Sequence, residues 1–169
     1  MTFRSILALL IIFSLLPGCK KKDSSGNPCD GVLNESAPTK IMVRFIDKAT
    51  GQNLILSKNL KAPDFNVMNT KTGEAFVTWR VVSEMTTSPS NGALELSVFH
   101  ETAAQYNYAI KVGNLGTATL AYSVSQTSTG TPCKPHSYPI SDIKITDHSF
   151  TQFVYEGKIY PNVLIVEID

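Results

Sequence analysis

The feature that most constrains the fold is an apolar–polar alternation with a period of two residues, which begins near Thr39. A period of two places successive side chains on opposite faces of a strand, whereas an amphipathic helix needs spacings of three and four. The alternation is clearest over residues 118–125, where Ala, Leu, Tyr and Val alternate with Thr, Ala and Ser. The same pattern predicts strands at residues 41–46, 75–82, 94–98, 106–112, 143–145, 150–155 and 163–168.

Three segments between these strands have the residues of tight turns. Asp47–Gly51 and Asn69–Gly73 both begin with an Asx residue and end in Thr-Gly, and Ser88–Gly92 ends in Asn-Gly. An Asx side-chain oxygen accepts a local amide, and glycine adopts positive φ without strain. No window of helical length shows a helical period, and the best candidate, His100–Tyr106, is short. We therefore expect at most one turn of helix.

These strands and turns predict an all-β fold. About nine short strands fall in about 130 residues, with a turn every 8–15 residues or so. Strands with one apolar and one polar face are typical of antiparallel sheets that expose one face to water. We predict one domain over residues 39–169, an antiparallel two-sheet sandwich preceded by a flexible tether. A closed barrel is the alternative.

One stretch of this region resembles a known type of sandwich domain. Residues 43–54, Val-Arg-Phe-Ile-Asp-Lys-Ala-Thr-Gly-Gln-Asn-Leu, look like the opening strand and hairpin of transthyretin-like and carboxypeptidase-regulatory-like domains. The resemblance implies an immunoglobulin- or transthyretin-like arrangement of the two sheets.

The N-terminal segment has a different character. Arg4 precedes an uncharged apolar run over residues 6–16. A helix of that length rises about 16 Å, roughly half of the hydrocarbon core of a bilayer, so it is too short to span a membrane. A positive charge, a short apolar run and small residues form the layout of a secretory signal.

The end of this signal, Leu16-Pro17-Gly18-Cys19, resembles the lipobox of bacterial lipoproteins. The resemblance implies that residues 1–18 are a signal peptide, that Cys19 is lipidated, and that the chain is cleaved before it. Each buried CH₂ of such a lipid contributes ~0.8 kcal/mol to membrane binding. The alternatives are a plain secretory signal with a chance cysteine and an uncleaved membrane helix.

Residues 19–38 are predicted to form a lipid-anchored flexible linker, because they are rich in Lys, Asp, Ser, Gly, Asn and Pro. Lys20–Lys22 are either a solvated part of it or contact lipid headgroups. Lys21-Lys22-Asp23 is similar in part to a surface-export signal of Gram-negative lipoproteins. We expect a lipid-anchored protein of the cell envelope, at the outer membrane, and both periplasmic and surface-facing locations stay open.

The charge balance disfavours one class of partner. Of 15 Lys and Arg residues one, Arg4, lies in the signal, so 14 remain against 14 Asp and Glu. A net charge near zero argues against nucleic acid as the main partner.

The cysteine count predicts a disulfide. If Cys19 is lipidated, Cys29 and Cys133 remain in an oxidising compartment. A bond between them would close a loop of about 100 residues, which is worth at most about 4–5 kcal/mol in the chain-entropy model. The alternative is a metal site with His136, but that set is one ligand short of a closed zinc site.

Motifs of catalysis are not found in the sequence. It contains no Gly-x-Ser-x-Gly, and His100, His136 and His148 are scattered singly, as expected of turn or surface residues. We therefore predict no catalytic residues, no metal and no cofactor. The alternative is an envelope hydrolase with an active site assembled from loops.

Aromatic residues indicate how such a domain could bind. Phe76 and Phe153 are predicted to face away from their apolar neighbours and to form a binding surface, whereas Trp79 between Val77 and Val81 is predicted to pack in the core. We expect a non-enzymatic sandwich with a protein or glycan partner.

Overall fold

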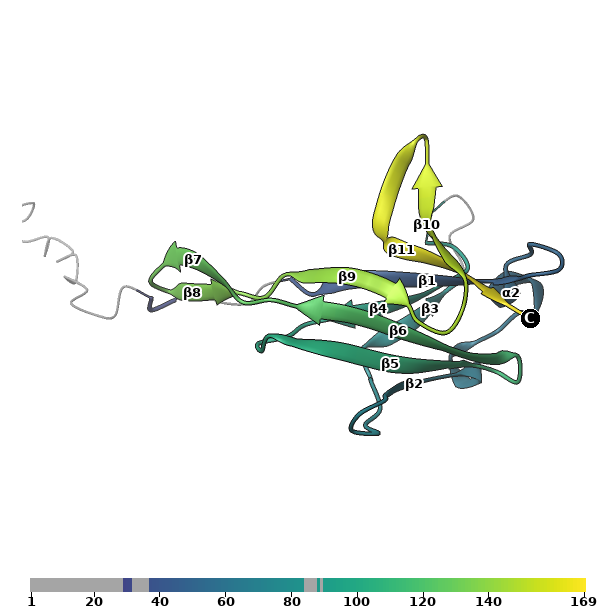
Figure 1. Cartoon of the computed structure of the whole chain (residues 1–169), viewed down its shortest axis with the longest axis horizontal. Helices are drawn as coiled ribbons and strands as arrows, with labels where there is room; N and C mark the ends of the chain where they lie inside the picture. Colours follow the sequence, from purple (N-terminus) through teal and green to yellow (C-terminus); the bar gives the residue numbers. More distant parts are fainter. Residues whose placement is uncertain (1–28, 32–36, 84–87, 89) are drawn as a thin grey trace, which may run out of the picture. The chain divides into compact units, whose positions relative to one another are not determined.

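The computed structural model describes residues 29–31, 37–83, 88 and 90–169 (Figure 1). The chain separates into two units, residues 1–33 and 34–169. In the first unit only a turn at residues 29–31 is described. Residues 1–18, Cys19 and most of the linker lie outside the described residues, so the signal, the lipid and the tether stay predictions.

The second unit is built almost wholly of strands. Its elements in chain order are β1 (Thr39–Asp47), α2 (Leu54–Ser57), the 3₁₀ turn η1 (Ala62–Asp64), β2 (Phe65–Asn69), β3 (Trp79–Val82), β4 (Ala93–Val98), β5 (Ala104–Val112), β6 (Gly116–Val124), β7 (Thr127–Thr131), β8 (Lys134–Ser137), β9 (Ile140–Ile145), β10 (Phe150–Tyr155) and β11 (Lys158–Ile168). The predicted all-β class is confirmed.

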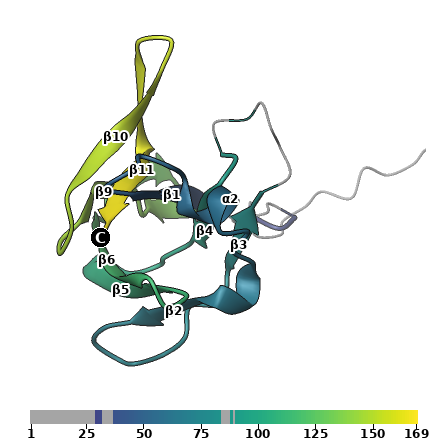
Figure 2. The ribbon, with the colours of Figure 1, turned by 90° about the vertical axis from the view of Figure 1, so that its right-hand side faces the viewer.

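The strands form two packed sheets and one separate hairpin (Figures 1 and 2). The larger sheet, called sheet A, has the order β10-β11-β1-β4-β3, and the smaller, sheet B, has the order β2-β5-β6-β9. The two-stranded sheet β7-β8 extends from the end of the sandwich. The predicted two-sheet sandwich is therefore confirmed.

The core lies between sheets A and B and follows from the alternation. In β1 the inward residues Ile41, Val43 and Phe45 are fully buried, while the residues between them are partly exposed. The Phe45 ring lies 6.2 Å from the ring of Phe65 in the other sheet. Burial of each such side chain contributes about 1.5–3 kcal/mol. Trp79 packs against this core, as predicted.

The pairing of the first and last strands departs from the predicted antiparallel order. β1 pairs with β4 antiparallel but with β11 parallel, in a register that sets Val43 beside Leu164 and Phe45 beside Val166. The period-two pattern specifies which face is buried but not the direction of a neighbouring strand. The other strand pairs of the described residues are antiparallel, as predicted, and the pair of β1 with β11 is the exception.

The segment predicted as one strand at 75–82 is divided. Only Trp79–Val82 belongs to sheet A, while the Phe76 amide donates to the Val67 carbonyl of β2 at 2.8 Å. Val77, which the pattern placed on the apolar face, is 82% exposed. The chain crosses here from the edge of sheet B to the edge of sheet A, so the alternation is interrupted.

The short helix also lies at a different place in the chain from the predicted one. It lies at Leu54–Ser57, where Asn53 caps it by accepting from the Leu56 amide at 3.1 Å. The predicted candidate, His100–Tyr106, instead leads into β5. One turn of helix is too short to show a period, so the sequence pattern could not find it.

The predicted Asx turns are confirmed. Asp47 Oδ1 accepts from the Thr50 amide at 2.8 Å and from its hydroxyl at 2.9 Å, and Gly51 has φ +69°. Asn69 Oδ1 accepts from two amides of its own turn, and Gly73 has φ +72°.

Three strands had no sequence signal. β2 is short and β7 and β8 are polar, with all five residues of β7 exposed. The turn between β7 and β8 carries Cys133, and both Cys29 and Cys133 are disulfide-bonded, as the cysteine count predicts.

Candidate functional site

A pocket of about 540 Å³ opens at one end of the sandwich, beside the β7–β8 hairpin. Its walls come from the start of β1, from residues 98–101 at the end of β4, and from residues 134–140. We call it the end pocket. Its volume lies in the range of about 300–1,000 Å³ that is typical of small-ligand sites. Phe99, His100, Glu101, His136 and Tyr138 are among the residues that line it.

Phe99 supplies an accessible aromatic surface in this pocket. β4 ends at the inward-facing Val98, so the next side chain points outward as the chain leaves sheet A for sheet B. Phe99 is 50% exposed and is one of seven large apolar residues that are exposed in the described part of the chain. An exposed ring that lines a concave surface is a feature of ligand sites.

Two tyrosines hold the His100 ring in place. Its Nε2 lies 2.8 Å from the Tyr122 hydroxyl, and its ring stacks on Tyr106 with centroids 3.7 Å apart. Burial lowers the pKa of His100 and raises the pKa of Tyr122. At neutral pH the site therefore presents an uncharged imidazole bonded to a protonated phenol. His100 thus lies in a loop, as expected, but it is half-buried rather than freely exposed.

The stacked rings continue into the sandwich as an aromatic ladder, which consists of His100, Tyr106, Tyr122, Tyr108 and Phe76. Tyr122 lies 5.6 Å from Tyr106 and 6.0 Å from Tyr108, and Tyr108 lies 5.1 Å from Phe76. Rings at these separations attract one another beyond their burial. The ladder holds the inner wall of the end pocket rigidly against the core.

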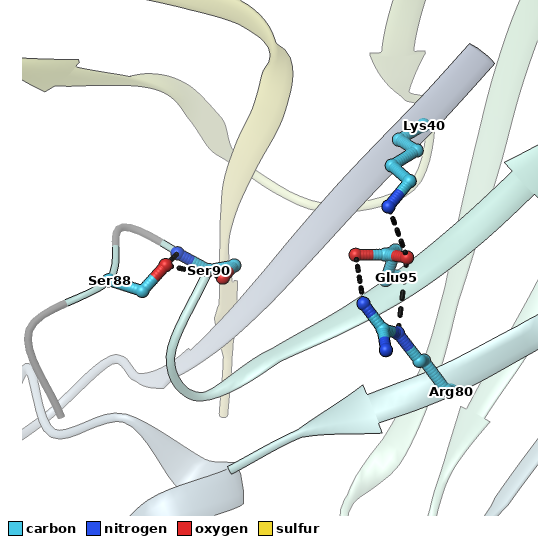
Figure 3. Close-up of polar contacts among 5 residues, drawn as sticks. All are labelled: Lys40, Arg80, Ser88, Ser90 and Glu95. Atoms are coloured by element: carbon cyan, nitrogen blue, oxygen red, sulfur yellow. Dashed lines mark hydrogen bonds and ion pairs between the residues drawn. The ribbon is translucent and has the colours of Figure 1, made fainter. Parts of the chain in front are cut away.

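A second polar centre lies on the outer face of sheet A (Figure 3). Glu95 accepts from Nε and Nη2 of Arg80, both at 3.1 Å, and pairs with Lys40 at 3.2 Å. Burial works to raise the pKa of Glu95, but the hydrogen bonds from Arg80 and Lys40 outweigh it and hold the pKa below its usual value. The Glu95 side chain is 6% exposed, while its partners are half exposed or more.

The charged groups of this centre pair with one another, which leaves the Glu95 carboxylate little capacity to bind or react with a ligand. Glu95 is occupied by three contacts, so its carboxylate is not positioned to take a proton from a ligand. We interpret it as an ion pair that holds β1, β3 and β4 together. No group of three or more His, Cys, Asp or Glu side chains that could hold a metal occurs among the described residues.

The two predicted surface aromatics do not come together. Phe76 belongs to the edge of the core, with its ring against Tyr108, so the expectation that it faces away from apolar neighbours is wrong. Phe153 is half-buried on β10, 6.1 Å from Tyr160, with the Arg44 guanidinium 5.3 Å from its ring centroid. A role of either residue in binding stays a prediction.

The end pocket itself was not predicted. Its residues come from three separate parts of the chain, and Phe99-His100 directly after a predicted strand was the one local signal. Only the fold brings these residues near Tyr138.

Comparisons with protein-family models, curated proteins and solved structures found no match. The likeness to transthyretin-like domains therefore stays a prediction. Within the described residues, no helix is long and apolar enough to cross a bilayer.

Proposed function

We propose that the chain is a lipid-anchored protein of the bacterial cell envelope, and that its β-sandwich binds an uncharged ligand with an apolar face, such as a glycan unit, in the end pocket. The observation that carries the binding proposal is the pairing of the exposed Phe99 ring with the neutral, immobilised His100 in one cavity. The ring can stack on an apolar ligand face, and the imidazole and Tyr138 hydroxyl can hydrogen-bond its polar edge.

The anchor is supported by the sequence alone. Leu16–Cys19 would supply the lipid, and residues 19–38 would hold the sandwich away from the bilayer, at the periplasmic or outer face of the outer membrane. The experiment is expression of the full chain with an alkyne fatty acid, followed by click labelling. We expect wild-type chain to be labelled and Cys19→Ala to be unlabelled. A labelled Cys19→Ala chain would contradict the anchor.

The binding proposal is tested with soluble envelope glycans. We would titrate defined peptidoglycan fragments and lipopolysaccharide core oligosaccharides into the detergent-solubilised full chain and record amide shifts by NMR. We expect shifts at Phe99, His100 and Tyr138, and a Kd at least tenfold weaker in Phe99→Ala. Val77→Ala is the matched control, because Val77 is exposed but lies outside the end pocket. Saturable binding that Phe99→Ala leaves unchanged would refute the site.

The second candidate is an envelope hydrolase, favoured by one observation. Glu101 and two histidines, His100 and His136, line the same pocket. However, the Nε2 atom of His100 pairs with the Tyr122 hydroxyl, whereas a triad histidine is paired with a nucleophile and a carboxylate. Release of product from the same glycans, lost in a Glu101→Gln variant, would favour the hydrolase over the binding module.

A further inference from the structure

The β10–β11 hairpin exposes an unusual amount of apolar surface. Val154, Tyr155 and Ile159 are 56%, 49% and 57% exposed, and all three lie within six residues of each other. Figures 1 and 2 show that this hairpin projects away from the body of the sandwich. Exposed apolar side chains gathered on one projecting element indicate a contact surface rather than the usual scatter.

The hairpin projects because β11 bulges. Gln152 pairs with Leu164, but the next residue, Phe153, pairs with Tyr160, so residues 161–163 have no partner in β10. Extra residues on one strand bend and twist a ladder. The outer half of the hairpin is thus a two-stranded ribbon, which is marginally stable by itself.

Both faces of this ribbon carry apolar side chains. Directly opposed residues share a face, so Val154 and Ile159 lie on one face and Phe153 and Tyr160 on the other. Phe153 and Tyr160 are half-buried, and Phe153 lies beside Arg44. The Val154–Ile159 face has no such cover within the part of the chain that the structure describes.

β10 is also an edge strand whose own sequence lacks the usual protective residues. Among the described strands only β11 pairs with it, and its sequence Phe-Thr-Gln-Phe-Val-Tyr has no charge, proline or glycine. Natural sheets normally place lysine, proline or a bulge on an edge because bare edges pair with other chains.

The other described edges of sheets A and B are protected. β3 carries Arg80, and β9 carries Asp142 and Lys144. The open side of β2 is covered, because the Phe76 amide donates to the Val67 carbonyl. β10 therefore differs in composition from β3 and β9, which carry charged residues, and in cover from β2.

We propose that β10 is a dimerisation edge, at which two copies of this chain pair their β10 strands antiparallel about a two-fold axis. The partner is a second copy because a two-fold antiparallel pair opposes this uncharged strand to itself, so no like charges meet across the interface. β10 is free of charge along its whole length. The pair would join two copies of sheet A and extend the Val154–Ile159 face across both molecules.

A six-residue edge is a small interface, so the dimer dissociates on dilution. Sedimentation of the detergent-solubilised full chain over a wide concentration range measures this. We expect a concentration-dependent dimer, a Kd at least tenfold weaker for Val154→Lys, and less than a threefold change for Ile159→Lys. Ile159 is the matched control because it is equally exposed on the same face but lies one strand inside the edge.

Cysteine cross-linking in intact membranes gives an independent readout. Single cysteines would replace Thr151, Gln152 or Val154, with Ile159→Cys as the control. Because a disulfide requires Cα atoms about 4.4–6.8 Å apart, we expect an interchain bond at one or two β10 positions only. A monomer at every concentration, cross-linking equal at all four positions, or equal weakening by both lysine variants would each overturn the proposal.

Discussion

His100 and Tyr122 form the polar link between the end pocket and the core, with Nε2 and the phenol oxygen 2.8 Å apart. His100 belongs to the connection between the sheets, whereas Tyr122 is 3% exposed in the middle strands of sheet B. This pair joins a loop residue in contact with the pocket to a side chain that cannot move without disturbing the core. The fold itself therefore fixes the position of the histidine ring.

The first prediction concerns the pH dependence of stability. Burial lowers the pKa of His100 from its ordinary value of 6.5, so between the folded and unfolded pKa values the unfolded chain binds more protons. The contribution of His100 to stability is thus fully present above pH 6.5 and falls as the pH drops toward the folded pKa. We expect the free energy of unfolding to decrease from pH 7.5 to 5.

The variant His100→Gln isolates this effect, since it retains hydrogen-bonding groups but does not titrate. Urea unfolding at several pH values should show a flatter profile for His100→Gln than for the wild type. Parallel profiles for the two proteins would show that His100 does not carry the dependence.

The second prediction concerns Tyr122→Phe. Removal of the hydroxyl leaves the His100 Nε2 without its partner while the ring stacking stays in place. We expect a loss of about 1 kcal/mol in the free energy of unfolding, the usual net value of one hydrogen bond. The matched control is Tyr155→Phe on the exposed hairpin, which should be neutral. Equal effects of the two changes in urea unfolding would contradict the structural role of the pair.

The third prediction concerns Glu95. Its pKa is lowered in the folded state, so its contribution to stability is present above the unfolded pKa and is lost as the pH falls through the folded pKa. Arg80 makes two of its three contacts and Lys40 one. We therefore expect Arg80→Gln to raise the pH midpoint of acid unfolding more than Lys40→Gln does. The reverse order would show that the bidentate contact is not the stronger one.

The fold was more predictable from the sequence than the site was. The reason is the separation along the chain of the residues that interact. β1 alternates cleanly, and β6 does so except at the buried Ala121, because each has one face on the core, so their burial follows largely from local sequence. The parallel pairing of Phe45 with Val166 joins residues from opposite ends of the domain, and no local pattern records it. The end pocket depends on the same kind of distant contact, since Phe99 and Tyr138 meet only after both sheets have formed.

The residue types of a turn predicted its structure where the contacts that close the turn lie within it. The Asp47–Gly51 loop closes through contacts between residues three or four apart, so its residues specify its shape. The break between Phe76 and Trp79 is the opposite case, because its continuous apolar alternation gives no sign that the chain changes sheets.

The last prediction compares two glycines of positive φ. Gly51 has φ +69° and a Cβ added there would meet nothing within 4 Å, so Gly51→Ala should cost only the backbone strain, about 1–2 kcal/mol. Gly92 has φ +72°, but its added Cβ would lie 2.5 Å from Asn53 Nδ2. Asn53 also donates to the Gly92 carbonyl at 2.8 Å and caps α2 through Leu56.

Gly92→Ala should therefore cost the same strain and also displace Asn53 from two hydrogen bonds. We expect its loss of unfolding free energy to be about twice that of Gly51→Ala, since each displaced bond is worth roughly 1 kcal/mol. Urea unfolding of both variants measures the difference, and Asn53→Ala gives the contribution of its two hydrogen bonds without the backbone strain. If Gly92→Ala and Gly51→Ala were equally destabilising, the Asn53 side chain would have to move away at no cost, and its contacts with Gly92 and Leu56 would not stabilise this end of the sandwich.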